Sequence, residues 1–333
     1  MPKKQHQEAQ EDIQLDSRLR ARLDEKKAKL DLHRPLAPLI VQRLYEDLRI
    51  RLTYHSNALE GNTLSLRETQ VVIEEGITIG GHSLREHLEA TNHASAFDEL
   101  TRLVDHSDPI TVETILHVHA LVLHDVHETA GQFRQTQVFI RGSEHLPPPA
   151  PQVPEFMAQW VRWQEREGIA YHPVIRAALA HHGFVAVHPF LDGNGRTSRL
   201  LLNLQLLRDG YAPAFLLREW KGRYLQALQA ADVGRYSSLV NVIGQAVEAG
   251  LDFYLDAFIA TPDENYQPLT ELALKHGYDV NYLGLLARQG KLEARKWNRR
   301  WHSTSAALAH YEEQVQAEPR GRPPRLREGS DTQ

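Results

Sequence analysis

Residues 188–199, with the sequence HPFLDGNGRTSR, combine side chains that suit phosphate chemistry. Gly193 and Gly195 allow unusual backbone dihedral angles and a close approach to a ligand. The segment runs into an apolar helical pattern, and the first N–H groups of a helix are unpaired and attract anions. Arg196 and Arg199 are three residues apart, so both guanidinium groups can reach the same side of that helix. This combination predicts a phosphate site.

Two further side chains of this segment indicate how a bound phosphate could react. Asp192 can hold a hard cation such as Mg²⁺ beside the phosphates. His188 can take up a proton near neutral pH. The structural alternative is a corner between two helices that carries its charges incidentally.

The complete pattern His-Pro-Phe-x-Asp-Gly-Asn-Gly-Arg-x-x-Arg resembles the signature of Fic proteins. The resemblance covers roughly residues 36–255 and implies transfer of AMP from ATP to a hydroxyl group of a protein. It also bears on the reaction type. Doc-type phosphotransferases carry Lys at the position of Gly195, so a glycine there favours AMP transfer over phosphorylation.

The resemblance further implies a role for each residue of the signature. Asp192 would bind the Mg²⁺ of ATP, and His188 would accept the proton of a Ser, Thr or Tyr hydroxyl. Arg196 and Arg199 would hold the β- and γ-phosphates. Backbone N–H groups would surround the phosphate at Gly193, Asn194 and Gly195.

Ser56 and Glu60 lie four residues apart near the end of an expected helix that begins at Leu36, so they share one face. From the spacing alone, both side chains are most simply solvent-facing. The segment Ser-x-x-x-Glu-Gly, however, resembles the inhibitory motif of Fic proteins. That resemblance implies an ion pair between Glu60 and Arg199, in which the carboxylate takes the place of the ATP γ-phosphate.

Residues 131–140 contain β-branched and aromatic side chains in partial alternation, which predicts a strand in a surface hairpin. Fic proteins carry a hairpin flap at this place that pairs with the target through main-chain hydrogen bonds. By this resemblance, the target-docking residues are Val138, Phe139 and Ile140.

The C-terminal part has the order helix, helix, hairpin, helix after a linker at 262–268. This order resembles the winged helix-turn-helix domains of excisionase and MerR-like proteins. Six bases and one acid lie between residues 281 and 302, which favours DNA, although a protein-binding module stays open. The candidate DNA contacts are Arg288, Lys291, Arg295, Lys296, Arg299 and Arg300.

The composition limits the remaining classes of function. Lys and Arg number 38 against 43 Asp and Glu, so the 333-residue chain as a whole is not a basic nucleic-acid coat. The absence of Cys excludes disulfides and thiol nucleophiles and fits a reducing compartment. Without a long apolar run or an apolar N-terminal segment, we expect a soluble, cytoplasmic protein with no membrane partner.

We therefore expect a mainly α protein, with a small β-hairpin flap on the Fic helical domain and a C-terminal winged helix-turn-helix. The expected divisions are a charged flexible arm (1–35), an N-terminal Fic region with the inhibitory helix (36–107), the catalytic core (108–260), the winged domain (261–316) and a disordered tail (317–333). Its function would be that of an autoinhibited protein adenylyltransferase. Two alternatives stay open, namely a hydrolase that removes AMP with the help of Glu60 and a transcription regulator with a nucleotide-sensing core. A homodimer is also left open.

Overall fold

The computed structural model describes residues 13–36, 38–104, 109–260, 266–297 and 300–317. The chain divides into two compact units, Met1–Leu255 and Asp256–Gln333. Helices dominate both units, which confirms the expectation of a mainly α protein. The start of the expected arm and nearly all of the expected tail lie outside the described residues. None of the described helices is both long and apolar enough to cross a bilayer.

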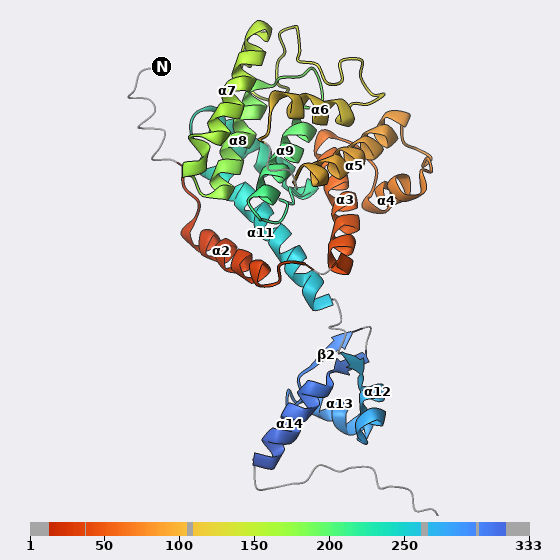
Figure 1. The fold of residues 1–333 in the computed structure, drawn as a ribbon. Coiled ribbons are helices and arrows are strands. Elements are labelled where there is room, and N and C mark those ends of the chain that lie inside the picture. Colours follow the sequence, from red (N-terminus) through yellow and green to blue (C-terminus); the bar gives the residue numbers. More distant parts are fainter. Residues whose placement is uncertain (1–12, 37, 105–108, 261–265, 298–299, 318–333) are drawn as a thin grey trace, which may run out of the picture. The chain divides into compact units, whose positions relative to one another are not determined.

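The first unit is a set of packed helices (Figure 1). The α-helices are α2 (Ser17–Leu32), α3 (Pro38–Glu60), α4 (Leu66–Glu75), α5 (Leu84–Val104), α6 (Val112–Val122), α7 (Val153–Glu165), α8 (Pro173–Val187), α9 (Asn194–Arg208), α10 (Lys221–Asp232) and α11 (Ser237–Ala260), the last of which extends past the unit boundary. Three short 3-10 helices are η1 (Ala150–Gln152), η2 (Gly168–Ala170) and η3 (Arg218–Trp220).

Helix α9 forms the centre of the first unit. It contacts α3, α5, α6 and α8, and nearly all of its side chains are buried. Leu200, Leu204 and Leu206 are at most 2% exposed. The apolar part of α9, residues 200–207, is covered on all sides. The polar N-terminal end is buried as well, since Arg196, Thr197 and Arg199 are at most 5% exposed. This end is therefore surrounded by elements from distant parts of the chain.

Several helix ends have a local chemical cause in the sequence. Gly61 ends α3 with φ +106°, a left-handed conformation that glycine adopts without strain. Ser65 and Glu68 form a capping box at the start of α4. Thr111 caps α6 by accepting a hydrogen bond from the backbone N–H of Thr114.

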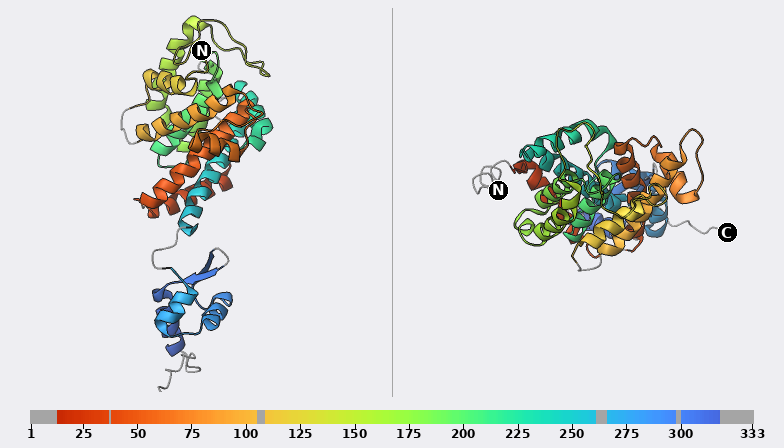
Figure 2. Two further views of the ribbon diagram at one scale, coloured as in Figure 1. Left: turned by 90° about the vertical axis from the view of Figure 1, so that its right-hand side faces the viewer. Right: turned by 90° about the horizontal axis from the view of Figure 1, so that it is seen from above.

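The expectation of a flexible arm over residues 1–35 is wrong for α2. Leu19, Leu23 and Leu30 are buried on one face of this helix. Figures 1 and 2 show α2 beside α11, where Arg22 and Lys26 form ion pairs with Glu248 at 2.7 and 2.9 Å. Because charged residues are frequent in this segment, the sequence did not show that three leucines form a narrow apolar face, through which α2 packs on the first unit.

The strand expected within residues 131–140 is also absent from the structure. Figure 1 shows that the connection between α6 and α7 runs outward and returns. The chain reverses at Arg141 and Gly142, without strand pairing in either arm. The returning arm contains Pro147–Pro149, which have no N–H groups to donate to a ladder. The two arms are joined by side chains instead, and we call residues 135–149 the flap.

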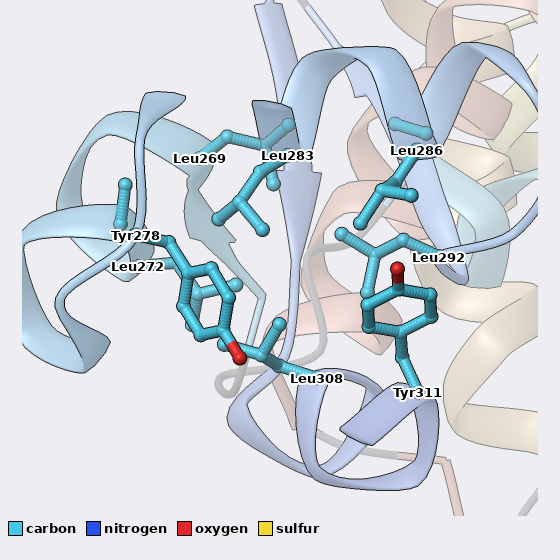
Figure 3. Close-up of a cluster of buried hydrophobic side chains, with 10 residues drawn as sticks. Leu269, Leu272, Tyr278, Leu283, Leu286, Leu292, Leu308 and Tyr311 are labelled. Atoms are coloured by element: carbon cyan, nitrogen blue, oxygen red, sulfur yellow. The ribbon is translucent and has the colours of Figure 1, made fainter. Parts of the chain in front are cut away.

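The second unit contains a small antiparallel sheet and three helices. The elements are β1 (Gln267–Pro268), α12 (Leu269–His276), α13 (Val280–Arg288), β2 (Ala294–Trp297), β3 (Arg300–Ser303) and α14 (Ser305–Ala317). The strand order is β1-β3-β2, and Ser303 pairs with both Gln267 and Ala294. Leucine and tyrosine side chains from the helices and from the connections between elements pack into one core around Leu272, Leu283 and Leu308 (Figure 3). The order helix, helix, hairpin, helix agrees with the sequence expectation, whereas β1 was not expected.

Candidate active site

The candidate site is the loop that joins α8 to α9. His188 ends α8 in a left-handed conformation (φ 48°, ψ 60°), and its N–H donates to the carbonyl of Phe184. Gly193 has φ +77° and precedes the first residue of α9. The buried side chain of Asn194 closes the loop, because its Oδ1 accepts from the N–H of Phe190 at 3.0 Å and its Nδ2 donates to the Phe190 carbonyl at 2.9 Å. The loop is therefore held as a rigid turn ahead of a helix N-terminus.

The N-terminus of α9 offers an anion site that is already covered by an acid. The first N–H groups of an α-helix have no acceptors within the helix and carry a partial positive charge. Among them, Gly195 lies directly beneath the carboxylate of Glu60. A Cβ atom at this position would lie 2.1 Å from Glu60 Oε1. Only a residue without a side chain allows this carboxylate to come so close.

Arg199, one turn into α9, is held by the end of α3. Its Nη2 lies 2.8 Å from Oε1 of Glu60. Its Nε donates to Oγ of Ser56 at 3.0 Å, and its Nη2 donates to the Ser56 carbonyl at 2.8 Å. The Arg199 side chain is 6% exposed, whereas that of Glu60 is 41% exposed. The structure thus brings together the three residues that the resemblance linked across more than a hundred positions.

Arg196 and Asp192 are engaged by α5 in a similar way. Nη1 of Arg196 lies 3.2 Å from Oε1 of Glu89, and its Nη2 lies 3.2 Å from Oδ1 of Asp192. Arg85, one turn before Glu89, forms an ion pair with the other oxygen of Asp192 and contacts Glu89 at 3.1 Å. Asn62 also donates to Glu89 at 3.1 Å. All charged residues of the predicted phosphate site therefore have internal partners of opposite charge.

Asp192, the expected ligand of a divalent cation, is paired with two arginines in this structure. Its carboxylate is half-buried and already has a cation on each oxygen, since Arg85 and Arg196 both contact it. Although burial alone would raise its pKa, the arginines and the N–H of Gly193 hold the pKa of Asp192 below its usual value. The described residues contain no cluster of three or more His, Cys, Asp or Glu side chains suited to a metal ion. A magnesium ion held by this one carboxylate would take its other ligands from phosphate and water, as Mg²⁺ commonly does.

His188 is placed as a neutral base. Burial lowers the pKa of His188 below its usual value, and the positive charge of Arg134 lowers it further. Its imidazole is therefore unprotonated at neutral pH and able to accept a proton. His188 lies at the end of α8, where the loop begins, and its role as a general base stays a prediction.

His119 on α6 is a site residue that the sequence reasoning missed. Its ring stacks on Phe190 with 3.5 Å between the centroids. Nδ1 accepts from the N–H of Gly131 at 3.0 Å, so Nε2 carries the proton and donates to the carbonyl of Asp192 at 3.0 Å. Burial lowers the pKa of His119 to about 4, which keeps the ring neutral. His119 thus holds the loop through Phe190 and the Asp192 carbonyl. In the sequence it is a single histidine in an apolar helix with Ile115 and Val118, and that pattern does not indicate this role.

Arg85, Glu89 and Arg134 were missed as well. The first two lie in a part of α5 that resembles Fic proteins, but the sequence gives no sign that they contact Asp192 and Arg196. Arg134 follows Gly131 in the predicted strand, where an alternating pattern suggested a surface position. It is instead 2% exposed.

The other predicted residues belong to the flap and to the second unit. In the flap, Phe139 is 78% exposed, while Val138 and Ile140 are half-buried. Among the DNA candidates, Arg288, Lys291 and Arg300 are exposed in the second unit. Arg295 and Lys296 lie on β2, and Arg299 falls outside the described residues.

Comparison with known proteins identifies the family. The model of the Fic/DOC family matches residues 109–206. A protein adenylyltransferase Fic from Culex quinquefasciatus is 37% identical over 245 residues, which cover 72% of this chain and 48% of that protein. The chain spans about half the length of such curated relatives.

Solved structures lead to the same family. Fic-1 (aa134–508) from C. elegans is 34% identical with a TM-score of 0.66, and the match covers 72% of this chain and 73% of that one. A Fic domain containing signaling protein from Bacteroides thetaiotaomicron is 27% identical with a TM-score of 0.67, over 73% of this chain and 100% of that one. The loop, the helices around it and these likenesses together establish that the chain belongs to the Fic/DOC family.

Proposed function

We propose that this protein transfers AMP from ATP to a hydroxyl group of a protein and that Glu60 holds it mostly inactive. The observation that carries this proposal is the Glu60 carboxylate, which lies on Arg199 and against Gly195 at the N-terminus of α9. An acid at this position occupies a site built for an anion. The names of the relatives, which are protein adenylyltransferases, support the same reaction.

In the proposed reaction, the oxygen of a Ser, Thr or Tyr hydroxyl attacks the α-phosphorus of ATP. His188 accepts the proton of that hydroxyl as the new P–O bond forms and the bond to pyrophosphate breaks. Proton transfer of this kind contributes about 10²–10⁴-fold to a rate. Arg196 and Arg199 stabilise the negative charge of the departing pyrophosphate, and the backbone N–H groups at Gly195 and its neighbours orient the phosphates.

Asp192 holds the magnesium ion of ATP in this proposal. When bound, the ion neutralises phosphate charge. The flap supplies the surface on which the target segment docks, through Val138, Phe139 and Ile140. An exposed main-chain edge accepts different target sequences, because its hydrogen bonds do not depend on side chains.

Inhibition follows from charge and space. The Glu60 carboxylate occupies the place of a γ-phosphate at Arg199 and repels that phosphate. ATP that binds beside it adopts a pose whose α-phosphate is not in line for attack. A geometric error of about 1 Å can lower a rate roughly a hundredfold.

Two substitutions test this function. Glu60→Gly should label the protein itself or an added protein from [α-³²P]ATP much faster than the unaltered chain. Label from [γ-³²P]ATP should not be retained, which separates AMP transfer from phosphorylation. His188→Ala in the Glu60→Gly background should abolish labelling. Equal labelling with and without Glu60, or labelling that survives the loss of His188, would contradict the proposal.

Removal of AMP is a second candidate, and it is favoured by the partial exposure of Glu60. A carboxylate that is 41% exposed beside the phosphate site could orient a water molecule. If the chain removes AMP, the unaltered chain should be the more active of the two proteins, whereas for AMP transfer the Glu60→Gly variant should be the more active. An AMP-modified protein would lose its AMP with the unaltered chain and keep it with the variant.

The second unit supports a separate proposal of DNA binding. Between residues 281 and 302 the charge is +6 − 1 = +5, and Arg288, Lys291 and Arg300 are exposed. Binding through phosphate contacts must weaken steeply as salt rises. Fluorescence anisotropy with a labelled duplex at low and physiological salt tests this, with Lys291→Gln/Arg300→Gln as the variant. Affinity that is independent of salt or of these bases would argue for a protein partner, and an effect of ATP on DNA affinity would support a nucleotide-sensing regulator.

A further inference from the structure

Arg134 is a buried arginine whose guanidinium group binds only carbonyl oxygens among its described partners. Its Nε donates to the carbonyl of His188 at 2.8 Å. Its Nη1 donates to the carbonyl of Thr136 at 3.0 Å, and its Nη2 donates to the carbonyl of Pro148 at 2.5 Å. The side chain is 2% exposed. These three carbonyls belong to the end of α8 and to the two arms of the flap.

Two further contacts join Arg134 to the loop between α8 and α9. Its backbone N–H donates to the carbonyl of Pro189 at 2.9 Å. Its Nη2 also lies 3.4 Å from the carbonyl of Val187. Three consecutive peptide groups, from 187 to 189, are therefore held by one residue.

This arrangement is costly, because a buried charge without a counter-ion loses its hydration. Burial lowers the pKa of Arg134 below its usual value. The carbonyl dipoles compensate for the lost water, and the planar fork of arginine reaches several of them at once. A lysine, with a single nitrogen atom at the end of its chain, could not span the same set. The geometry therefore requires arginine in particular.

The contacts also explain how the flap keeps its shape without a strand ladder. Its outgoing arm contributes Thr136 and its returning arm contributes Pro148, and both are bound to the same guanidinium group. Farther along, Ser143 donates to Asp232 at 3.1 Å and Gln229 donates to the Gly142 carbonyl at 2.7 Å, which fixes the flap tip to α10. Arg134 thus links the base of the flap directly to the His188 carbonyl, and His145 adds a second contact from the flap to the Ala186 carbonyl at 2.9 Å.

We propose that Arg134 is a positioning residue that sets the distance between the target-docking flap and the general base His188. This inference rests on the proposed AMP transfer. A target segment bound along the flap would present its hydroxyl to His188 only while both are held by the same side chain. The nucleotide is held by the opposite end of the loop, at Gly195 and Arg199, and does not depend on this link.

Hydrogen–deuterium exchange of the full-length chain tests the structural half of the inference. In Arg134→Lys, the hydrogen-bonded amides of Ser143, His145, His188 and Phe190 should exchange about tenfold faster, since the loss of a hydrogen bond to a charged group costs about 1.5 kcal/mol. Amides of α9 should be unchanged. The matched control is Arg141→Lys, at the exposed turn of the same flap. Unchanged exchange in the flap of Arg134→Lys would overturn the inference.

Kinetics in the Glu60→Gly background test the functional half, with the His188→Ala chain as the acceptor protein. Arg134→Lys should raise KM for the acceptor and lower kcat by up to about a hundredfold, while KM for ATP stays within about twofold. Added methylguanidinium should restore part of the transfer to Arg134→Ala. A loss of ATP affinity equal to the loss of transfer would indicate a merely structural role and refute the inference.

The two halves separate this inference from the proposed function. If the Glu60→Gly parent transfers no AMP, the function fails, while the exchange result still decides whether Arg134 holds the flap to the loop. If the Glu60→Gly parent is active and Arg134→Lys leaves kcat and the KM values for both acceptor and ATP unchanged, the function stands and the positioning role is overturned.

Discussion

Glu60 reaches Arg199 across the bare backbone of Gly195, where a Cβ atom would lie 2.1 Å from Glu60 Oε1. The carboxylate therefore occupies the space directly over the first turn of α9 in addition to forming an ion pair. A phosphate group cannot share that space. The Glu60 carboxylate and a nucleotide phosphate are consequently alternatives at this position, so Glu60 must leave before a phosphate enters it.

The hydroxyl of Ser56 should contribute to this inhibition. Its Oγ accepts a hydrogen bond from Arg199 at 3.0 Å and holds the guanidinium group toward α3. A hydrogen bond to a charged group contributes about 1.5 kcal/mol, so Ser56→Ala should raise basal labelling by up to about tenfold. Labelling from [α-³²P]ATP measures the effect. The control is Ser95→Ala, whose hydroxyl is exposed on α5 and should leave the rate unchanged.

Arg85 should compete with the divalent cation. Its guanidinium group forms an ion pair with the Asp192 carboxylate that would bind magnesium. Because the Arg85 side chain is 54% exposed, solvent screens the pair, and Arg85→Met should tighten cation binding by about threefold. Titration with Mn²⁺ in the presence of a non-hydrolysable ATP analogue, followed by electron paramagnetic resonance, measures this directly. Arg102→Met is the control on the same helix, and an equal effect of both variants would rule out competition.

Labelling should persist in mildly acidic solution. The folded-state pKa of His188 is lowered by burial, so the neutral imidazole is present above that pKa and is lost only as pH falls through it. The rate of the Glu60→Gly variant should therefore decline at a pH below the value of about 6.5 that is usual for histidine. A pH profile of kcat at saturating ATP checks this. A midpoint above 6.5 would show that His188 is not the group being titrated.

The N-terminal helix should stabilise the first unit. Leu23 on α2 is 0% exposed, so Leu23→Ala should lower the free energy of unfolding by about 2–5 kcal/mol. Leu32→Ala on the same helix is the control, because Leu32 is 85% exposed and should change stability by less than about 0.5 kcal/mol. Urea denaturation compares the two variants. Equal midpoints would indicate that α2 is not docked in solution.

The sequence was most informative where one local pattern carried the information. The segment from His188 to Arg199 predicted the loop, and the resemblance linked Glu60 to Arg199. The capping box at Ser65 and Glu68 and the end of α3 at Gly61 followed from local backbone chemistry alone. Each of these features depends on neighbours in the chain or on a motif with a known spacing.

The sequence was least informative where a side chain acts on a distant segment. Nothing near Arg134 indicates that carbonyls from 136, 148 and 188 converge on it, and its position in an alternating stretch suggested a strand instead. His119 lies on an apolar helix face and stacks on Phe190 from another element. Arg85 and Glu89 contact Asp192 and Arg196 only because α5 packs beside α9, and the sequence of α5 does not indicate these contacts. Such contacts arise from tertiary packing, for which a single sequence gives no spacing rule.

The burial of α3 determines how quickly the inhibited state can open. Thr53 and Asn57 on this helix are 0% and 3% exposed, and Asn57 donates to the Glu89 carbonyl at 3.1 Å. The helix therefore cannot leave without unfolding part of the core, whereas the partly exposed Glu60 side chain can rotate away by itself. Rotamer changes of exposed side chains take picoseconds to nanoseconds. Under the proposed mechanism we therefore expect opening to be fast relative to turnover, so that the degree of inhibition depends on the fraction of time that the Glu60 side chain spends away from Arg199.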